Sequence, residues 1–389
     1  MQTIIPSKTR TVRGSVIFSD PGPPGGGGGR VPKWSGEMAM SGGSLTAARA
    51  SVEPPPRWLC RSVHRMFHAC IGILTIFLAA AWLGAVSPAE SSPPSDWLSE
   101  RNRDHRLAGL IWDSATGQVL SPEGLIRRLA RSDYVLLGEV HDNWDHHRLQ
   151  AWVIAGLVEA GHRPSVAWEM LDWDAQPRLD AYAGDAAGLG EALEWADSGW
   201  PEWSAYAPIA EAALSAGLPQ RAANLPKARM GLLARGRLTA LDPEERRRLA
   251  LDEVWPEDFD SSLLDELEDA HCGLVPRSRL TGMASVQRAR DGAMAAVMVE
   301  ERADGRSPVV LIAGAGHVRP DRGVPWYLRA LDPGSTSLSL SFVEVSDSAV
   351  QPGSYAGGRW AGQILWFTPA AQRPDPCEQF RERLESQRE

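Results

Sequence analysis

Short apolar runs alternate with helical patterns along the chain, and this alternation limits the possible folds more than any other feature. Runs of this length are typical of buried strands, whereas apolar residues spaced three or four apart indicate helices. Helical spacing is clear over 144–159, where Leu149, Val153 and Leu157 share one side and Gly161 follows the end. The expected strands are 134–137, 165–168, 220–223, 308–313, 337–345 and 363–367.

Longer helical stretches occupy 189–216 and 227–302, the second rich in Arg, Glu and Leu. Strands that alternate with helices are typical of a sheet covered by helices on its faces. The sequence therefore predicts an α/β fold with a central mixed or parallel sheet flanked by helices. The stretch 227–302 is expected to form a helical insertion between the third and fourth of these strands.

The first part of the chain has the composition of a disordered extension followed by a targeting segment. Residues 1–56 contain PGPPGGGGGR, SGGS and EPPP, which lack the periodic apolar residues of a core. In 57–88, basic residues precede the apolar run ACIGILTIFLAAAWLGAV, and small residues follow it. This pattern predicts a signal peptide or an uncleaved signal-anchor. Residues 89–106 are expected to be a linker, 107–370 an α/β domain and 371–389 a C-terminal tail.

A targeting segment implies an exported protein, either periplasmic or anchored to the inner membrane by that segment alone. Cys60 and Cys70 precede or lie within the segment, so only Cys272 and Cys377 belong to the exported part. In an oxidising compartment these two could pair, and two separate buried thiols are equally consistent with the sequence. A net charge of -9 argues against a general nucleic-acid partner.

Reactive side chains follow the predicted strands where each strand ends. The first strand is followed by Glu139 and His141, the second by Glu169, the third by Asn224 and the fourth by His317. Ligands of open α/β sheets bind beyond the carboxyl ends of the strands. Glu139, His141, Glu169 and His317 are therefore predicted to form one pocket, although each alone could be a helix cap, an ion-pair partner or a satisfied loop histidine.

The residues directly after His141 have a structural interpretation. Asp142, Asn143 and Asp145 are the residue types that cap the start of a helix, here the one over 144–159. His146 and His147 fall inside that helix, and one of them is expected to face the solvent. Chemistry at the first strand end is therefore assigned to Glu139 and His141 alone.

Several stretches together resemble the ChaN-like haem-binding proteins, whose superfamily includes the Tiki metalloproteases and the erythromycin esterases. The matching stretches occur in the family's order and span about 107–370. They are VLLGEVHDN at 135–143, WSAYAPI at 203–209, AANLP at 222–226, VQRARDGAMA at 286–295, LIAGAGHVRPDRGVPWYL at 311–328 and LWFTP at 365–369.

This resemblance implies a haem-binding protein of the bacterial cell envelope that takes part in haem or iron uptake, with two haems stacked across a homodimer. Tyr206 is the first candidate for the iron ligand, because a tyrosine has been proposed for that role in the family. The 16 Trp residues outnumber Phe and Tyr together, and Trp144, Trp152, Trp203 and Trp326 among them could help to supply a flat apolar slot. The residues expected to bind the cofactor are Tyr206, His141, His317, Asn224, Gln287 and Arg290.

The other branches of the superfamily imply a metal-dependent hydrolase as the alternative, so enzyme activity stays open. In that case Glu139, His141, Glu169 and His317 would be catalytic, with His141, His317 and Glu139 binding a divalent metal ion. Acid–base catalysis without a metal would use the same side chains. Gln287 and Arg290, on one predicted helix with Asp291, would line the pocket or form a structural network with the strand-end carboxylates.

Overall fold

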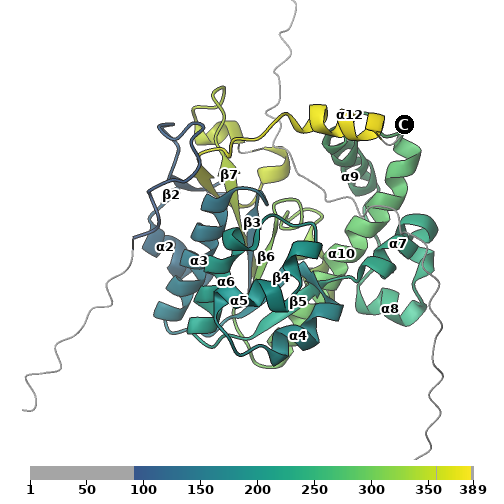
Figure 1. The fold of residues 1–389 in the computed structure, drawn as a ribbon, viewed down its shortest axis with the longest axis horizontal. Helices are drawn as coiled ribbons and strands as arrows, with labels where there is room; N and C mark the ends of the chain where they lie inside the picture. The colour runs from purple at the N-terminus through teal and green to yellow at the C-terminus, as the bar shows by residue number, and fades with distance from the viewer. Residues whose placement is uncertain (1–91, 356, 387–389) are drawn as a thin grey trace, which may run out of the picture. The chain divides into compact units, whose positions relative to one another are not determined.

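A single eight-stranded sheet forms the centre of the protein (Figure 1). The computed structural model describes residues 92–355 and 357–386, so the predicted N-terminal extension and signal segment lie outside the described residues. The strand order is β2-β1-β8-β7-β3-β6-β4-β5. Strand β1 is antiparallel to both of its neighbours, β2 and β8, and every other neighbouring pair is parallel. The predicted α/β fold with a mixed sheet is therefore confirmed.

The six predicted strands are present, each within one to four residues of its expected bounds. The strands are β1 (Ile111–Asp113), β2 (Val119–Leu120), β3 (Tyr134–Glu139), β4 (Ser165–Asp172), β5 (Gln220–Asn224), β6 (Val309–Gly314), β7 (Ser337–Glu344) and β8 (Ile364–Thr368). The antiparallel pair β1 and β2 was not predicted, because segments of three and two residues carry almost no periodicity.

Helices cover both faces of the sheet, and the two-residue period of β3 explains why. Val135 and Leu137 point into a core with α3 and α6, whereas Tyr134 and Leu136 point into a second core with α10 and α11. The helices of the first layer and its edge are α2 (Pro122–Leu129), α3 (Trp144–Glu159), α4 (Gln176–Ala181), α5 (Ala186–Ala192) and α6 (Trp203–Ser215).

The second face carries the helical insertion between β5 and β6. It comprises α7 (Lys227–Gly236), α8 (Pro243–Arg248), α9 (Glu257–Ala270) and the long α10 (Arg277–Ala303), and α11 (Val324–Leu331) follows β6. The continuous helical stretch expected over 189–216 is instead broken between α5 and α6. Gly199 has a φ of +87° there, which is outside the helical region, and Pro201 follows it. A proline lacks the backbone N–H group that a continuing helix would use.

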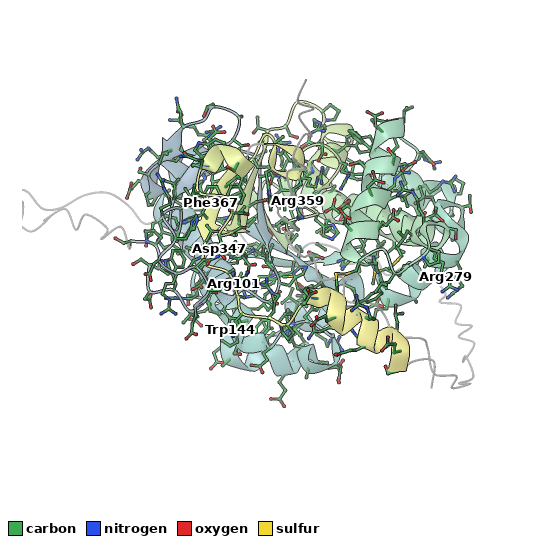
Figure 2. All side chains as sticks on the ribbon, turned by 90° about the horizontal axis from the view of Figure 1, so that it is seen from above. Arg101, Trp144, Arg279, Asp347, Arg359 and Phe367 are labelled. Atoms are coloured by element: carbon green, nitrogen blue, oxygen red, sulfur yellow. A yellow bond between two sulfur atoms is a disulfide. The ribbon has the colours of Figure 1, made fainter. Side chains whose placement is uncertain are left out.

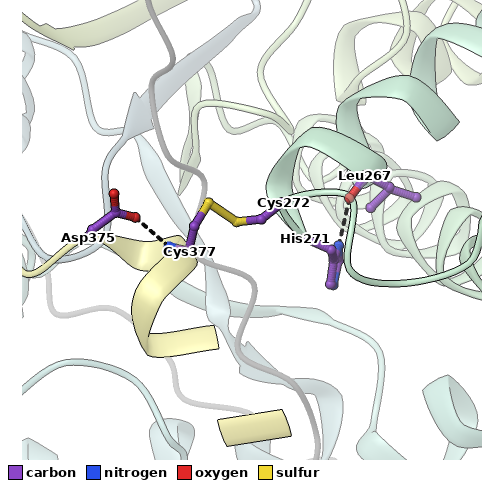
Figure 3. Close-up of a disulfide and its surroundings, with 5 residues drawn as sticks. All are labelled: Leu267, His271, Cys272, Asp375 and Cys377. Carbon is purple, nitrogen blue, oxygen red and sulfur yellow. Dashed lines mark hydrogen bonds between the residues drawn. A yellow bond between two sulfur atoms is a disulfide. The ribbon is translucent and has the colours of Figure 1, made fainter. Parts of the chain in front are cut away.

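The C-terminal segment is tied to the insertion by a disulfide. Cys377, in α12 (Pro376–Ser386), is bonded to Cys272 in the turn between α9 and α10 (Figure 3). Of the two possibilities that the sequence allowed, pairing is the observed one.

At the other end of the described chain, the backbone amides of Leu98 and Ser99 donate to Asp145 at 2.8 Å. No helix within 92–355 and 357–386 combines the length and apolar character needed to cross a membrane.

Candidate functional site

The carboxyl ends of β3 and β6 approach each other closely because glycine lies at the contact. A Cβ atom on Gly138 would lie 3.2 Å from the backbone of Ala315 and would overlap Val318. The Ala315 amide donates to the Glu139 carbonyl at 2.9 Å, which joins the two strand ends directly. Glu139 and the turn that leads to His317 are thereby brought to one edge of the sheet, as the sequence predicted.

Glu139, the last residue of β3, organises the first half of the site. Its Oε1 atom accepts hydrogen bonds from His141 Nδ1 and from Tyr206 Oη, both at 2.8 Å. Burial raises the pKa of the Glu139 carboxyl, but attraction to His147 and the hydrogen bond from His141 outweigh it, so the pKa lies below its usual value. Glu139 is therefore an ionised acceptor that fixes the orientation of the His141 ring.

His141 is the member of this half that reaches solvent. Its side chain is 10% exposed, and its ring meets the edge of Trp200 with the centroids 4.8 Å apart. Burial lowers the pKa of His141, but the charges of Glu169 and Glu139 raise it above its ordinary value. Because Nδ1 donates to Glu139, Nε2 is the nitrogen left to meet a ligand.

His146 and His147 are both fully buried, so the expectation that one of them faces solvent was wrong. His147 Nε2 lies 3.4 Å from Glu139 Oε2, and its ring stacks on Tyr206 at 4.0 Å. His146 accepts from the Val140 amide at 2.9 Å, and burial lowers its pKa to about 4, so it is neutral. The cap of α3 is as predicted, since Asn143 accepts from the Asp145 amide at 3.1 Å.

The second half of the site is built on Glu169, in β4. Its Oε2 accepts from the Gly314 amide at 2.6 Å, and its Oε1 accepts from Arg290. Asn224 joins this group from the end of β5, because its Nδ2 donates to the Glu169 carbonyl at 2.8 Å while its Oδ1 accepts from Arg290. Burial raises the pKa of Glu169, but His317, Arg290 and His141 lower it far more, so Glu169 is ionised.

His317 lies between this carboxylate and α10. Its Nδ1 donates to Asp291 Oδ1 at 2.5 Å, its Nε2 is 3.2 Å from Glu169, and Gln287 Nε2 is 2.9 Å from Nδ1. Burial lowers the pKa of His317, but the charges of Glu169 and Asp291 raise it to about 9. His317 is therefore an imidazolium at neutral pH, held on both sides by acceptors.

The two halves meet over Gly314. A Cβ atom on Gly314 would lie 3.6 Å from Glu169 Oε2 and only 2.8 Å from His141 Nε2, which is too close, so glycine is needed here for His141 to pack against the end of β6. On the other side of His317, a cavity of about 10 Å³ can hold about one water molecule. Its lining residues are Leu263, Glu266, Gln287, Asp291, Gly316 and Arg322.

All eight predicted site residues lie in these two groups, but their accessibility differs. Tyr206 is fully buried and donates to Glu139, and burial and Glu139 raise its pKa well above the ordinary value. Its role as iron ligand stays a prediction, and this placement favours a role in orienting Glu139. Of the four tryptophans expected to form a slot, three pack against other tryptophan rings and Trp144 is 40% exposed. The packed ones are Trp152, Trp203 and Trp326.

The predicted divalent-metal site finds no support in the described part of the chain. No group of three or more His, Cys, Asp or Glu side chains there has the arrangement of a metal site. His141 Nδ1 is hydrogen-bonded to Glu139, and both His317 nitrogens face carboxylates, so His141, His317 and Glu139 do not converge on one point. The donor set is that of two carboxylate–imidazole pairs.

Comparisons with known proteins agree with the family resemblance. A family model described as "Haem-binding uptake, Tiki superfamily, ChaN" matches residues 125–328, more than half of the chain. A search of curated proteins found no match.

Among solved structures, the fold is similar to that of "Cofacial heme binding to ChaN of Campylobacter jejuni", with 21% identity, a TM-score of 0.53, and 66% of this chain and 95% of that chain covered. An erythromycin esterase in its open conformation also matches, with 16% identity, a TM-score of 0.32, and 66% and 81% covered. The type III effector HopBA1 matches with 14% identity, a TM-score of 0.36, and 63% and 92% covered.

Proposed function

Because this chain belongs to the family of ChaN-like haem-binding uptake proteins of the Tiki superfamily, we propose that it binds haem, with His141 as the residue that holds the iron. The observation that carries the assignment of His141 is its geometry. Its Nδ1 is fixed by Glu139 at 2.8 Å, its ring is the most exposed of the site imidazoles, and only a residue without a side chain, Gly314, fits beside Nε2. A carboxylate behind a ligating imidazole orients the ring and raises its basicity.

The other candidate ligands fit haem less well. Tyr206 would have to leave a fully buried hydrogen bond with Glu139, and His317 is held between Asp291 and Glu169. A bound haem would supply an iron that accepts the free imidazole nitrogen. This chain's residues would orient the imidazole, and Trp200 would lie beside its ring.

Haem titration of the full chain tests this proposal. We expect a Soret band on binding, and in His141→Ala a shifted band with affinity reduced at least about tenfold. His162→Ala, a partly exposed histidine beyond the end of α3, is the matched control and should bind like the parent. Tyr206→Phe should keep most of the affinity. Loss of the Soret band in Tyr206→Phe with retention in His141→Ala would assign the iron to Tyr206 instead.

We further propose that the protein works outside the cytoplasm in haem or iron uptake. The apolar segment 69–86 supports export, and the Cys272–Cys377 disulfide suits an oxidising compartment. Fractionation of cells that express the full chain should recover it outside the cytoplasm with the disulfide formed. Recovery from the cytoplasm with free thiols would contradict export. A homodimer that forms on haem binding is a further expectation, measured as the mass in solution with and without haem.

One observation favours a metal-free hydrolase as a second candidate. The imidazolium of His317 is a proton donor paired with Asp291, and it faces ionised Glu169, whose Oε2 lies beside Gly314 as His141 Nε2 does. This arrangement places an acid and a possible base around one small volume. Ester hydrolysis that is unaffected by chelators and is lost in Glu169→Gln and His317→Gln would support this candidate. Equal background rates in the parent and both variants would reject it.

A further inference from the structure

The turn that carries His141 is closed by the Asn143 amide, which donates to the Val140 carbonyl at 2.9 Å. His141 and Asp142 are the two central residues of this turn. The Asp142 carboxylate accepts two hydrogen bonds, from Nε and Nη2 of Arg373, both at 2.7 Å. A guanidinium fork that makes two parallel bonds fixes direction as well as distance. The orientation of the residue next to His141 therefore depends on an arginine that lies 231 positions further along the chain than Asp142.

Arg373 also holds the end of the neighbouring strand. Its Nη1 and Nη2 atoms donate to the Glu344 carboxylate at 2.7 and 2.6 Å, and Glu344 is the last residue of β7, which pairs with β3. Glu344 also accepts from Asn143 Nδ2 at 2.8 Å, so it contacts the same turn. The side chains of Arg373, Asp142 and Glu344 are 17%, 28% and 16% exposed, and water screens these ion pairs less than it screens fully exposed ones. One arginine thus joins the His141 turn to the sheet through two carboxylates.

The backbone around Arg373 is held in place on both sides. Before it, the Ala371 amide donates to Glu344 Oε1 at 3.0 Å. After it, Cys377 is bonded to Cys272 in the turn between α9 and α10. The sequence predicted only a C-terminal tail here, and the segment lies beyond the part of the chain that matches the family model. The family resemblance therefore assigns no role to these contacts.

We propose that Arg373 is a positioning residue for His141 and acts on it through Asp142. In the proposed function, on which this role depends, Nε2 of His141 holds the haem iron. Glu139 fixes the His141 ring at Nδ1, but the ring can keep that contact and face a ligand only while the turn keeps its orientation. Nη2 of Arg373 contacts an oxygen of Asp142 and an oxygen of Glu344, so these two carboxylates would repel each other without the guanidinium. Loss of Arg373 should therefore displace Asp142 and the turn with it.

A purely structural role would be to fasten the C-terminal segment, and the loss of Arg373 would then lower stability without changing His141. Arg302 provides a matched control, because it also joins two carboxylates, at the opposite end of β3. It lies 3.1 Å from Asp133, which precedes β3, and 2.9 Å from Asp332. Arg302→Gln should lower the urea midpoint of unfolding and leave the site unchanged.

Hydrogen exchange of the full chain, followed by mass spectrometry, tests the turn without any ligand. In Arg373→Gln, the amides of residues 140–146 should exchange at least about tenfold faster than in the parent protein, because two charge-assisted forks are lost. Arg302→Gln should exchange them at the parent rate, and so should Arg279→Gln, which removes an exposed arginine at the outer edge of the insertion (Figure 2). Arg373→Lys keeps the charge but cannot form two forks, so it should exchange like Arg373→Gln and decides the question if Arg373→Gln does not fold. Unchanged exchange in both Arg373 variants would overturn the proposal.

Haem titration of the same variants tests the consequence for the ligand. Affinity for haem should fall at least about tenfold in Arg373→Gln and in Asp142→Ala, and the double variant should lose no more than either one, because Arg373 acts through Asp142. Additive losses would mean that Arg373 contacts haem directly, and faster exchange with unchanged affinity would make it a structural residue; either result would overturn the proposal. No Soret band in the parent protein would refute haem binding, while the exchange rates still decide whether Arg373 fixes the turn.

Discussion

Removing the Cys272–Cys377 disulfide should lower the free energy of unfolding by several kcal/mol. The bond joins the turn after α9 to the first turn of α12 and closes a loop of 105 residues (Figure 3). In the chain-entropy model, a cross-link over a loop of this length restricts the unfolded chain by about 5 kcal/mol at 25 °C. The double variant Cys272→Ser/Cys377→Ser removes that restriction.

The packing lost with the bond is small, so most of the effect should come from the unfolded state. None of the described residues of α12 is buried, and its Phe380 ring lies against His271, the residue that follows α9, with ring centroids 5.5 Å apart. Arg373 continues to hold the preceding segment, because it pairs with Asp142 at 2.7 Å and with Glu344 at 2.6 Å. We therefore expect a loss of about 3 to 5 kcal/mol.

Urea unfolding of the full chain, followed by tryptophan fluorescence, measures this loss. Dithiothreitol should lower the unfolding midpoint of the parent protein and leave that of the double variant unchanged. A difference below about 1 kcal/mol between the oxidised parent and the variant would refute the loop-entropy reasoning. A non-reduced peptide map without the cross-linked peptide would refute the bond itself.

Three further predictions concern the site. Gly314→Ala places a Cβ 2.8 Å from His141 Nε2, so haem affinity should fall at least about tenfold with an unchanged circular dichroism spectrum; unchanged affinity would exclude that nitrogen. Because the pKa of His317 is raised from 6.5 to about 9 in the folded protein, protonated His317 stabilises the fold. This stabilisation is complete below pH 6.5, and the free energy of unfolding should fall by about 3 kcal/mol as the pH rises to 9. The free energy of unfolding of His317→Gln, measured over the same pH range, should not show this fall. Asn143→Ala removes a helix cap and the hydrogen bonds to Glu344 and Pro369, so urea unfolding should show a loss of at least about 2 kcal/mol, and a loss below 0.5 kcal/mol would contradict the cap.

The sheet could be predicted from the sequence because burial on both faces leaves a strong pattern. The parallel strands β3 and β6 are buried throughout and, apart from Glu139 at the end of β3, are uninterrupted apolar runs. Their reactive residues were expected at one edge for the same reason, since parallel strands end on the same side. Glu139 and His317 indeed lie there, 178 positions apart in the chain, and no local pattern other than the strands themselves connects them.

The burial of both His146 and His147 was not predicted, because neighbouring residues of a helix point in different directions and one of the two was expected to face the solvent. The apolar side of α3 runs through Leu149 and Val153, and continuing that side backwards by one turn reaches His146. The periodicity therefore predicts burial of His146, whereas the burial of His147 depends on its stacking on Tyr206 from α6. The pairing of His317 with Asp291 could not be predicted at all, because it depends on how α10 crosses the end of β6.

The two halves of the site are anchored in different layers of the protein. Glu139 is held by Tyr206 from α6 and by His147 from α3, on one face of the sheet, whereas His317 is held by Asp291 from α10, on the other. The two halves adjoin at Gly314, where an added Cβ atom would clash with His141 Nε2 and contact Glu169 Oε2. A change in the α3 and α6 layer can reach His317 through these residues and through the hydrogen bond from the Ala315 amide to the Glu139 carbonyl. Coupling between the layers should be concentrated at the one point where a ligand would contact both.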